Sequence, residues 1–503
     1  MLEKLLPTRL ARTSRIESNE TQDKRTDTEL SPLSCSISGA ESTPKAVASH
    51  WSLLTALLGF FIITLDALVV SVALPAIQTT FDGGIGGLQW VIDAYSLPFA
   101  ALLLFAGTVS DRLGARTTFA IGLVVFTISS GACGLAPTLS LLVVARLLQG
   151  AGAALMTPAS LALISEAYPD PIARSRAIGI WAVGGAVASA SGPLVGGALT
   201  TLSWRLIFLI NLPIGALALW LLSRVPISRT TAHAFDWAGQ VASITCLTAI
   251  TAGLIQAGDL GITHSTVIFC LIIAAVAAVA FLFLQSRSKH PMVPLDMFRS
   301  PTIAIPVAIG FTFMAGFFGM VFLVSLYFQQ QRGLTPLETG FAFAPVTVFS
   351  IAMPIIAARL AERFGSRVPI IIGQAAMATG FFLLSLLGQN ASVPVFVAMM
   401  IPVGLGAGLA MPSATSVLLN SVRSTRSGIA SGVLNTSRQV GGALAVAGFG
   451  ALVTAFGFEH GMKASFIISG ALLVITMLAS MPEAALRHSL PQGESSPASN
   501  PST

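Results

Sequence analysis

The stretch Leu53–Ile77, "LLTALLGFFIITLDALVVSVALPAI", carries a single charged residue, Asp66, within a run that is almost entirely apolar. An apolar run of about 20 residues is long enough to cross the hydrocarbon core of a bilayer as a helix. An ionisable side chain inside such a helix is costly to insert and marks a functional site by default. The stretch therefore predicts a membrane helix and makes Asp66 a candidate site residue.

The composition of the whole chain favours the same class of protein. Its 503 residues are 54% hydrophobic and 10% charged, whereas soluble domains carry about a quarter charged residues. The net charge of +6 is scattered between apolar runs and forms no basic stripe, which argues against nucleic-acid binding. The four cysteines have neither paired nor CxxC spacing, so we expect neither a disulfide framework nor a metal site.

Fourteen apolar segments, each about 20 residues or longer, predict fourteen membrane helices. They lie at residues 51–74, 88–109, 117–136, 139–163, 176–201, 205–224, 237–256, 264–286, 301–329, 336–358, 368–388, 392–420, 427–456 and 464–482. We expect an all-α polytopic protein of the cell membrane.

The distribution of basic residues predicts the orientation. With the N-terminus inside, the short inner loops hold fourteen Lys and Arg residues, and the outer loops hold only Arg205, Arg332 and Lys463. The positive-inside rule then places both termini in the cytoplasm. Residues 1–50 and 483–503 are polar and rich in Ser and Pro, so we expect disordered cytoplasmic tails.

An internal repeat indicates how the helices are grouped. "GTVSDRLGART" (107–117) aligns with "ARLAERFGSRV" (358–368), and "GAGAALMTPAS" (150–160) aligns with "GLGAGLAMPSA" (404–414). The repeat pairs the second segment with the tenth and the fourth with the twelfth. We therefore predict two six-helix bundles, at 51–224 and 301–482, with two inserted helices at 237–286. Parallel halves of this kind are typical of a large class of secondary transporters.

Several motifs resemble the major facilitator superfamily, and within it the fourteen-helix drug:proton antiporter branch. "GTVSDRLGAR" resembles its loop motif, and "ARLLQGAGAA" resembles its fourth-helix motif with a buried arginine, here Arg146. "GGAVASASGPLVGG" resembles the antiporter signature, with Ala188 where glycine is usual; "LDALVVSVALPAI" resembles the first-helix motif, with Ser71 where asparagine is common. Together with "QWVIDAYSL", these motifs are most similar to exporters of the methylenomycin A-resistance type.

Three intramembrane charges, Asp66, Asp93 and Arg146, are candidates for proton coupling. Counted at 1.5 Å per residue, all three fall about 8–12 Å below the predicted outer boundary. The matching positions of the second half are uncharged, near Phe317, Ala344 and Met400. Desolvation favours a neutral carboxyl and a nearby arginine favours a charged one, so movement of Arg146 relative to Asp66 would switch proton binding. Asp93 is either a second proton site or the anion that meets a cationic drug.

The loop motif and its copy are candidate gating elements. Arginines at helix ends either latch the bundles together through charge-assisted hydrogen bonds or serve only as topogenic charges. These residues are Gly107, Asp111, Arg112, Gly114 and Arg116 in the first half, and Glu362, Arg363 and Arg367 in the second.

The fifth predicted helix carries a stripe of small residues beside a helix-breaking proline. The stripe is formed by Gly184, Ala188, Gly192 and Gly196, and Pro193 and Gly197 complete the antiporter motif. The stripe allows either ordinary close packing or packing that also shifts during gating, and the resemblance implies export.

A drug cavity would need apolar and polar lining residues. The aromatic candidates are Phe61, Trp90 and Tyr95. Asn435, Arg438 and Gln439 share one face of a predicted helix, and this polar cluster either faces substrate or is structural.

The leading hypothesis is a proton-coupled exporter of small amphipathic or cationic toxic compounds, working by alternating access as a monomer. The alternatives are a proton-coupled importer of a small metabolite and a membrane sensor or lipid translocator without coupled flux. The sequence lacks a G-x-x-x-x-G-K-[ST] loop, H-E-x-x-H and G-x-S-x-G. We therefore expect neither an enzyme nor a cofactor, with the proton gradient as the driving force.

Overall fold

The computed structural model describes residues 43–228, 230, 235–288, 291–388, 391–422 and 426–482, and its regular elements there are all helical. Most of the predicted tails, and the predicted inner-loop residues Arg229, Lys289 and Arg423, lie outside the described residues. The helices discussed below pack within one unit, Lys45–Thr503.

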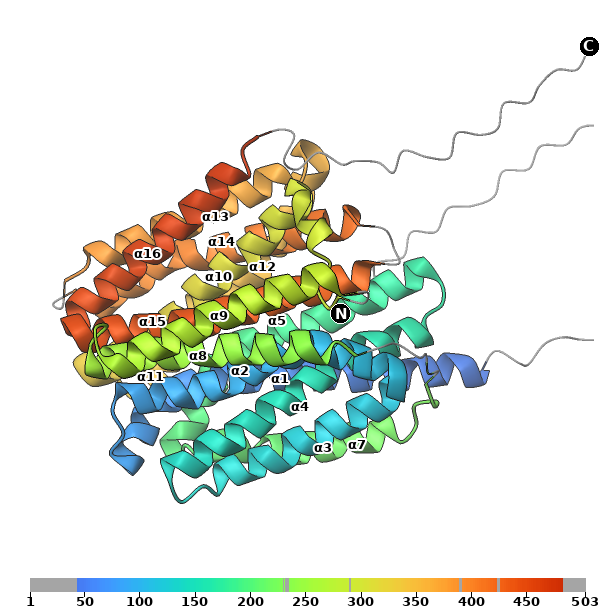
Figure 1. Ribbon diagram of the computed structural model, residues 1–503, viewed down its shortest axis with the longest axis horizontal. Coiled ribbons are helices and arrows are strands. Elements are labelled where there is room, and N and C mark those ends of the chain that lie inside the picture. The colour runs from blue at the N-terminus through green and yellow to red at the C-terminus, as the bar shows by residue number, and fades with distance from the viewer. Residues whose placement is uncertain are drawn as a thin grey trace, which may run out of the picture. The chain divides into compact units, whose positions relative to one another are not determined.

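The first half of the described chain forms one helical bundle, seen in the lower part of Figure 1. Its helices are α1 (Thr43–Phe81), α2 (Ile85–Leu113), α3 (Ala115–Gly134), α4 (Leu139–Ala167), α5 (Pro171–Leu202), α6 (Leu206–Leu209) and α7 (Asn211–Leu222). α6 and α7 together occupy the sixth apolar segment. α5 bends by 41° beside Ala190, because Pro193 has no N–H to bond the carbonyl four residues before it.

The last helices form a second bundle, in the upper part of Figure 1. They are α10 (Pro301–Leu326), the π-helical turn η2 (Tyr327–Gln331), α11 (Pro336–Ala342), α12 (Ala344–Phe364), α13 (Arg367–Leu386), α14 (Val393–Asn420), α15 (Ser427–Phe456) and α16 (Phe458–Ala479), after the short 3-10 helix η1 (Leu295–Arg299). α11 and α12 meet at Phe343 and share one apolar segment.

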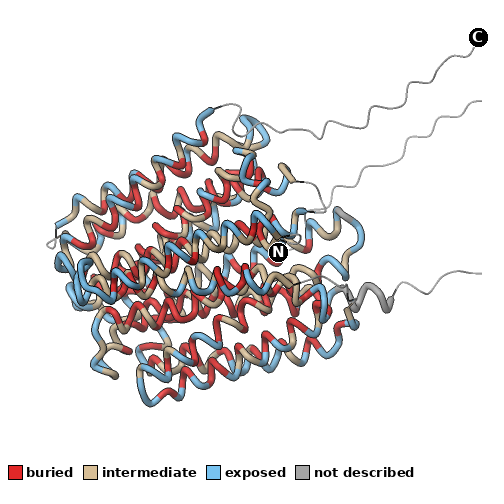
Figure 2. The backbone as a smooth tube through the Cα atoms, viewed as in Figure 1, coloured by how far each residue is buried: buried red, intermediate tan, exposed pale blue. Residues whose placement is uncertain are grey.

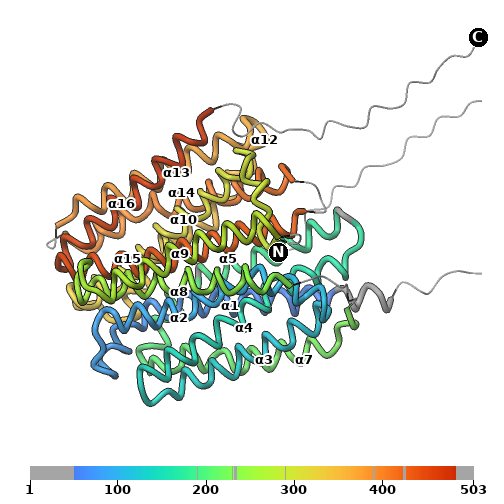
Figure 3. The backbone as a smooth tube through the Cα atoms, in the orientation of Figure 1, coloured from blue at the N-terminus to red at the C-terminus, as the bar shows by residue number. Residues whose placement is uncertain are grey.

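The inserted pair, α8 (Trp237–Leu260) and α9 (Ser265–Arg287), lies between the bundles (Figure 3). α8 packs against both α2 and α15. Gln240 of α8 donates a 2.9 Å hydrogen bond to the carbonyl oxygen of Ala101 on α2, and Gly258 lies against Ala451 on α15. α8 therefore touches each half of the protein at the place where the halves meet.

Each of the fourteen predicted segments corresponds to a helix or to a broken helix. Twelve described helices are long and apolar enough to span a membrane; α5 is a bent span, and α6 with α7 makes a shorter apolar one. The helix of the first segment extends beyond residue 74, since α1 continues through Pro75 to Phe81. Asp66 therefore lies 15 residues, about 22 Å, from the end of α1, and its predicted depth of 8–12 Å below the membrane boundary stays a prediction.

The sequence repeat is also a structural repeat. Gly122 and Gly152 bring α3 and α4 into backbone contact, and Gly373 and Gly406 do the same for α13 and α14. Small residues at these crossings permit the close approach. The turns after α2 and α12 also match: Gly114 has φ +83° and Gly365 has φ +82°, a conformation that disfavours residues with a Cβ. We call the end of the bundles that carries these two glycines the motif end, and the end that carries residues 82–84 the far end.

The two bundles meet along two seams, one between α2 and α15 and one between α5 and the α11–α12 segment. Buried residues follow the central helices, whereas α9 and much of α12 are exposed, as expected of lipid-facing helices (Figure 2). At the far end, Gly340 of α11 lies directly against the carbonyl oxygen of Pro193 on α5. Gln329 also donates a 2.8 Å hydrogen bond to the carbonyl oxygen of Val72 on α1. These contacts hold the far end closed.

Gly340→Ala is expected to weaken this closure, because the added Cβ would lie 2.5 Å from the Pro193 carbonyl oxygen. Overpacking of this kind costs about 1–3 kcal/mol, which favours the open far end by about fivefold or more. The measurement is the rate at which a water-soluble thiol reagent labels a cysteine introduced by Leu194→Cys, in protein whose native cysteines are replaced by alanine. Leu194 lies beside Gly340.

Gly448→Ala is the matched control, because no atom lies within 4 Å of a Cβ added there. Equal labelling rates in the two variants would show that the Gly340 contact does not hold the far end closed.

Candidate functional site

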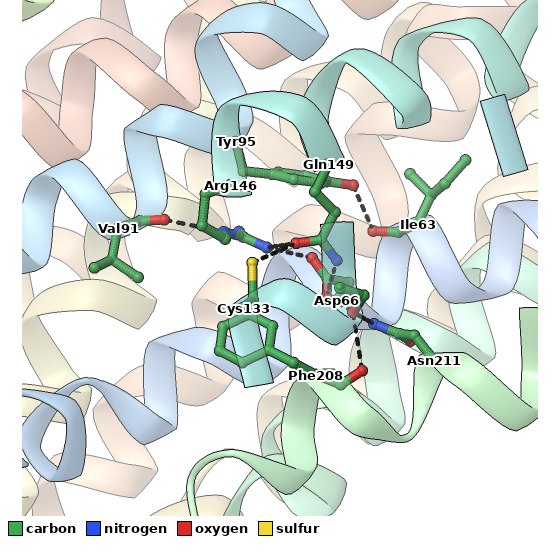
Figure 4. A network of polar contacts seen from close by, with 10 residues as sticks. Ile63, Asp66, Val91, Tyr95, Cys133, Arg146, Gln149, Phe208 and Asn211 are labelled. Carbon is green, nitrogen blue, oxygen red and sulfur yellow. Dashed lines mark hydrogen bonds and ion pairs between the residues drawn. The ribbon is translucent and has the colours of Figure 1, made fainter. Parts of the chain in front are cut away.

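A buried ion pair lies at the centre of the first bundle. A guanidinium nitrogen of Arg146 on α4 is 2.5 Å from Oδ2 of Asp66 on α1, and the two side chains are 1% and 0% exposed. Figure 4 shows the carboxylate and the guanidinium pointing toward each other between the helices. The predicted partnership of these two residues is therefore present in the structure.

Two amide side chains complete the shell around the carboxylate. Nε2 of Gln149 donates to Oδ1 of Asp66 at 2.8 Å, and Nδ2 of Asn211 on α7 donates to the same oxygen at 2.9 Å. Asn211 also donates to the hydroxyl of Ser130 on α3 at 3.0 Å, and that hydroxyl donates to the carbonyl oxygen of Phe208. Helices α4 and α7 thus donate hydrogen bonds to the Asp66 carboxylate, and α3 and α6 hold the Asn211 donor in place through Ser130 (Figure 4).

Arg146 has partners other than Asp66. Its Nε donates to the carbonyl oxygen of Val91 at 3.1 Å, and a terminal nitrogen donates to Oε1 of Gln149 at 3.0 Å. The guanidinium carbon lies 4.3 Å from the ring centroid of Tyr95, a cation–π contact. The hydroxyl of Tyr95 donates to the carbonyl oxygen of Ile63. Tyr95 is 1% exposed, so its predicted place in a drug cavity is wrong for this conformation: it packs beneath the arginine.

Asp93 is separated from this site by the rotation of α2. Residues two apart on a helix point about 200° away from each other, and Tyr95 faces Arg146. Asp93 instead shares a face with Gln89, one turn earlier, whose amide nitrogen donates to the carbonyl oxygens of Val446 and Ala447 on α15. Asp93 therefore lies toward the seam with the second bundle, on a different face of α2 from the one that contacts the Asp66–Arg146 pair.

The Asp93 carboxyl is buried without a partner. It is 0% exposed, and neither of its oxygens has a hydrogen bond within the described chain. A carboxyl buried in this way inside a membrane helix is costly to retain and marks a candidate functional residue.

The loop motif contacts the first bundle and the connector that follows it. The backbone N–H of Arg116 donates to the hydroxyl of Ser228 at 3.0 Å, and the guanidinium of Arg112 lies 4.6 Å from the ring centroid of Phe235. These contacts differ from the expected latch across the bundle interface. In the second copy, the guanidinium of Arg363 lies over the ring of its neighbour Phe364.

The small-residue stripe of α5 packs along α1. Added side-chain carbons would meet α1 at three turns of α5, with Leu57 opposite Gly184, Leu68 opposite Gly192 and Val69 opposite Gly196. Ala188 is fully buried within the same stripe. Gly197, at the far end of the stripe, lies against the backbone of Pro336 on α11. The stripe therefore joins α1 to the seam between the bundles.

The polar cluster on α15 is only partly satisfied. Arg438 donates to the carbonyl oxygen of the Asn435 side chain at 3.4 Å, and its Nε has no partner within the described chain. Gln439 is half-buried, as are Phe61 and Trp90. These residues lie on three different helices, and their role in binding substrate stays a prediction. An apolar surface groove between α8 and α9, lined by Trp237, Val241, Ile272, Val276 and neighbouring residues, lies apart from all of them.

Gln149, Asn211 and Ser130 were missed by sequence reasoning. Asn211 interrupts the apolar run "WRLIFLINLPIG" (204–215), and a polar residue inside such a run is a usable signal. Among the described residues, no group of three or more His, Cys, Asp and Glu side chains is arranged to hold a metal ion.

Two helical bundles related by a repeat, joined along two seams and carrying a buried ion pair, define a membrane transporter of the two-bundle class. The family model of the Major Facilitator Superfamily matches residues 56–446. The chain therefore belongs to the Major Facilitator Superfamily.

Characterised relatives cover most of the chain. The multidrug resistance protein Stp of Mycobacterium tuberculosis is 38% identical over 405 residues, which cover 79% of this chain and 75% of that protein. The methylenomycin A resistance protein of Streptomyces coelicolor is 36% identical over 419 residues, 82% of this chain and 87% of that protein. The xylose transporter XylE from E. coli, in a partially occluded inward open conformation, shares the fold with a TM-score of 0.61 at 16% identity, over 86% of this chain and 97% of that one.

Arg146→Ala is expected to destabilise the protein by about 3–5 kcal/mol, because it leaves Asp66 as a buried charge without its partner. The measurement is thermal unfolding of the purified protein in detergent. Arg426→Ala is the matched control, since it breaks an ion pair with Asp296 whose side chains are 51% and 57% exposed. Exposed pairs contribute less than about 1 kcal/mol. Similar losses in both variants would contradict a structural dependence on the buried pair.

Proposed function

We propose that the protein is a proton-coupled exporter of small amphipathic or cationic drugs in the cell membrane. The observation that carries the proposal is the buried Asp66–Arg146 pair, whose matching positions in the second bundle are the uncharged Phe317 and Met400. Relatives at 38% and 36% identity, named as multidrug and methylenomycin A resistance proteins, support export of drug-like compounds. Membership in a family of transporters supports transport over catalysis, with the chain acting as a monomer.

The orientation that we propose places the motif end in the cytoplasm, as the arginines of the loop motif favour. The far end, where Gly340 meets the carbonyl of Pro193, then faces outward. The described conformation is closed on the outside, the state in which an exporter collects its substrate from the cell or the inner leaflet.

Proton binding would change the packing of α1. A proton on Asp66 removes the charge that holds Arg146, while Arg146 keeps Val91 and Gln149 as partners. The attraction between α1 and α4 then falls, and α1 can move relative to α4. Because α1 packs along the small-residue stripe of α5, this movement would reach Gly197 and the seam with α11. Protonation of one carboxyl thus acts on the closure of the far end.

The membrane potential can supply free energy for export. One elementary charge moving through a membrane potential of 100 mV yields about 2.3 kcal/mol. Arg146 and a proton compete for the Asp66 carboxylate, since Asp66 is either paired with Arg146 or protonated. Drug exit and proton entry are coupled if the drug binds when Asp66 is ionised.

We assign Asp93 as a second proton site rather than as the anion that meets a cationic drug. The carboxyl is 0% exposed in the described state, which leaves a drug no access to it. Charged residues on the helices packed against α2 include Arg146 on α4, Asp259 on α8 and Arg438 on α15. Neither oxygen of Asp93 bonds any of them.

Asp66→Asn is expected to abolish proton release from everted membrane vesicles when ethidium is added, because the amide cannot carry a proton in exchange. The loss of a pH-sensitive fluorescence signal measures this. Asp82→Asn is the control: Asp82 lies in an exposed turn with φ +51°, a conformation that asparagine adopts readily. Undiminished proton release in the Asp66→Asn vesicles would refute the proposed coupling site.

Asp93→Asn separates the two roles of that residue. If Asp93 is a proton site, the Asp93→Asn variant is expected to bind ethidium as the unaltered protein does. The number of protons that it releases per ethidium is expected to fall. Binding is measured by fluorescence anisotropy of purified protein in nanodiscs. Loss of ethidium binding together with unchanged proton release on a neutral drug would assign Asp93 to the cation instead.

A further inference from the structure

Asn211 holds an unusual position in the shell around Asp66. Its side chain is 1% exposed. Nδ2 donates to both Oδ1 of Asp66 and the hydroxyl of Ser130, at 2.9 and 3.0 Å. Oδ1 of the same amide is buried and has no hydrogen-bond partner. One half of the carboxamide is thus fully used, and the other half is unused.

Protonation of Asp66 reverses what the carboxyl needs from its neighbours. An ionised carboxylate only accepts hydrogen bonds, whereas a protonated one has an O–H that must find an acceptor. In the described state three nitrogens donate to Asp66, from Arg146, Gln149 and Asn211. Each suits the ionised form, and none offers an acceptor to the acid.

Asn211 is the member of this shell that can change its role. A carboxamide carries a donor group and an acceptor oxygen of nearly equal size, so a half-turn exchanges them in place. Oε1 of Gln149 already accepts from Arg146 and from the thiol of Cys133, and Arg146 has only donors. The unused Oδ1 of Asn211 is therefore the acceptor that is free to serve a protonated Asp66.

We propose that Asn211 is a positioning residue that serves both protonation states of Asp66, donating to the carboxylate and, after a half-turn of its amide, accepting from the acid. The Ser130 hydroxyl accepts from Nδ2 in the first orientation. In the second, its single proton turns from the carbonyl oxygen of Phe208 to Oδ1 of Asn211. The proton itself stays on Asp66, and Arg146 remains charged throughout. This inference rests on the proposed role of Asp66 as the proton site.

The test is the pH dependence of ethidium binding to purified protein in nanodiscs, where protonation of Asp66 weakens binding. Asn211→Leu removes the donor from the ionised form and the acceptor from the neutral form. Hydrogen bonds to a charged group are the stronger of the two, so the ionised form loses more and the protein protonates at higher pH. The midpoint of the binding curve is expected to rise by about one pH unit.

Three further variants make the outcome specific. Asn211→Ser keeps a group that both donates and accepts, and is expected to return the midpoint most of the way to that of the unaltered protein. Ser130→Ala removes the second anchor of Asn211 and is expected to shift the midpoint in the same direction by less. Asn420→Leu is the matched control, because the Asn420 amide donates to Ser416 on an exposed surface, away from Asp66.

The results separate this inference from the proposed function. If Asp66→Asn leaves the pH dependence of binding unchanged, the proposed proton site fails. If the pH dependence of binding requires Asp66, but the Asn211→Leu and Asn420→Leu variants have the same pH midpoint, the positioning role of Asn211 is overturned. Should Asn211→Leu not fold, the Ser130→Ala midpoint decides, and a midpoint equal to that of Asn420→Leu overturns the inference.

Discussion

The first bundle is organised around one electrostatic constraint: a charged pair in a place that water does not reach. Asp66 and Arg146 are 0% and 1% exposed, so every hydrogen bond that water would supply must come from neighbouring helices. α4 supplies Gln149, α7 supplies Asn211 and α2 supplies the carbonyl of Val91. The rotation of each of these helices is fixed by the need to present its group to the pair.

The second bundle shows what the fold is without that constraint. It repeats the glycine crossings of the first, at Gly373 and Gly406, and the turn glycine at Gly365. Met400, which corresponds to Arg146 in the repeat, is fully buried among apolar side chains. A six-helix bundle can therefore form without the ion pair. The two charged residues are present despite the free-energy cost of burying them, which indicates another purpose. The proposed purpose is a proton site whose state changes the packing of α1.

Apolar runs located the fourteen segments, and the charges inside these runs located Asp66 and Arg146 as partners. The end of α1 escaped prediction because a proline is tolerated when neighbouring helices support the backbone. The roles of Gln149 and Asn211 were not predicted, because neutral amides do not stand out in composition. Only the rotation of each helix shows which amide side chains face the carboxylate. The separation of Asp93 from the pair could have been found by counting 100° per residue from Tyr95, provided that the face of α2 carrying Tyr95 was known.

The central claim is that Asp66 alternates between pairing with Arg146 and holding a proton. Infrared difference spectroscopy of the purified protein in lipid, recorded as the pH is lowered, observes this directly. A carboxylate band is expected to fall and a protonated-acid band to rise, and both changes are expected to be smaller in the Asp66→Asn variant by the contribution of one carboxyl. The same pair of bands at full amplitude in Asp66→Asn would contradict the claim.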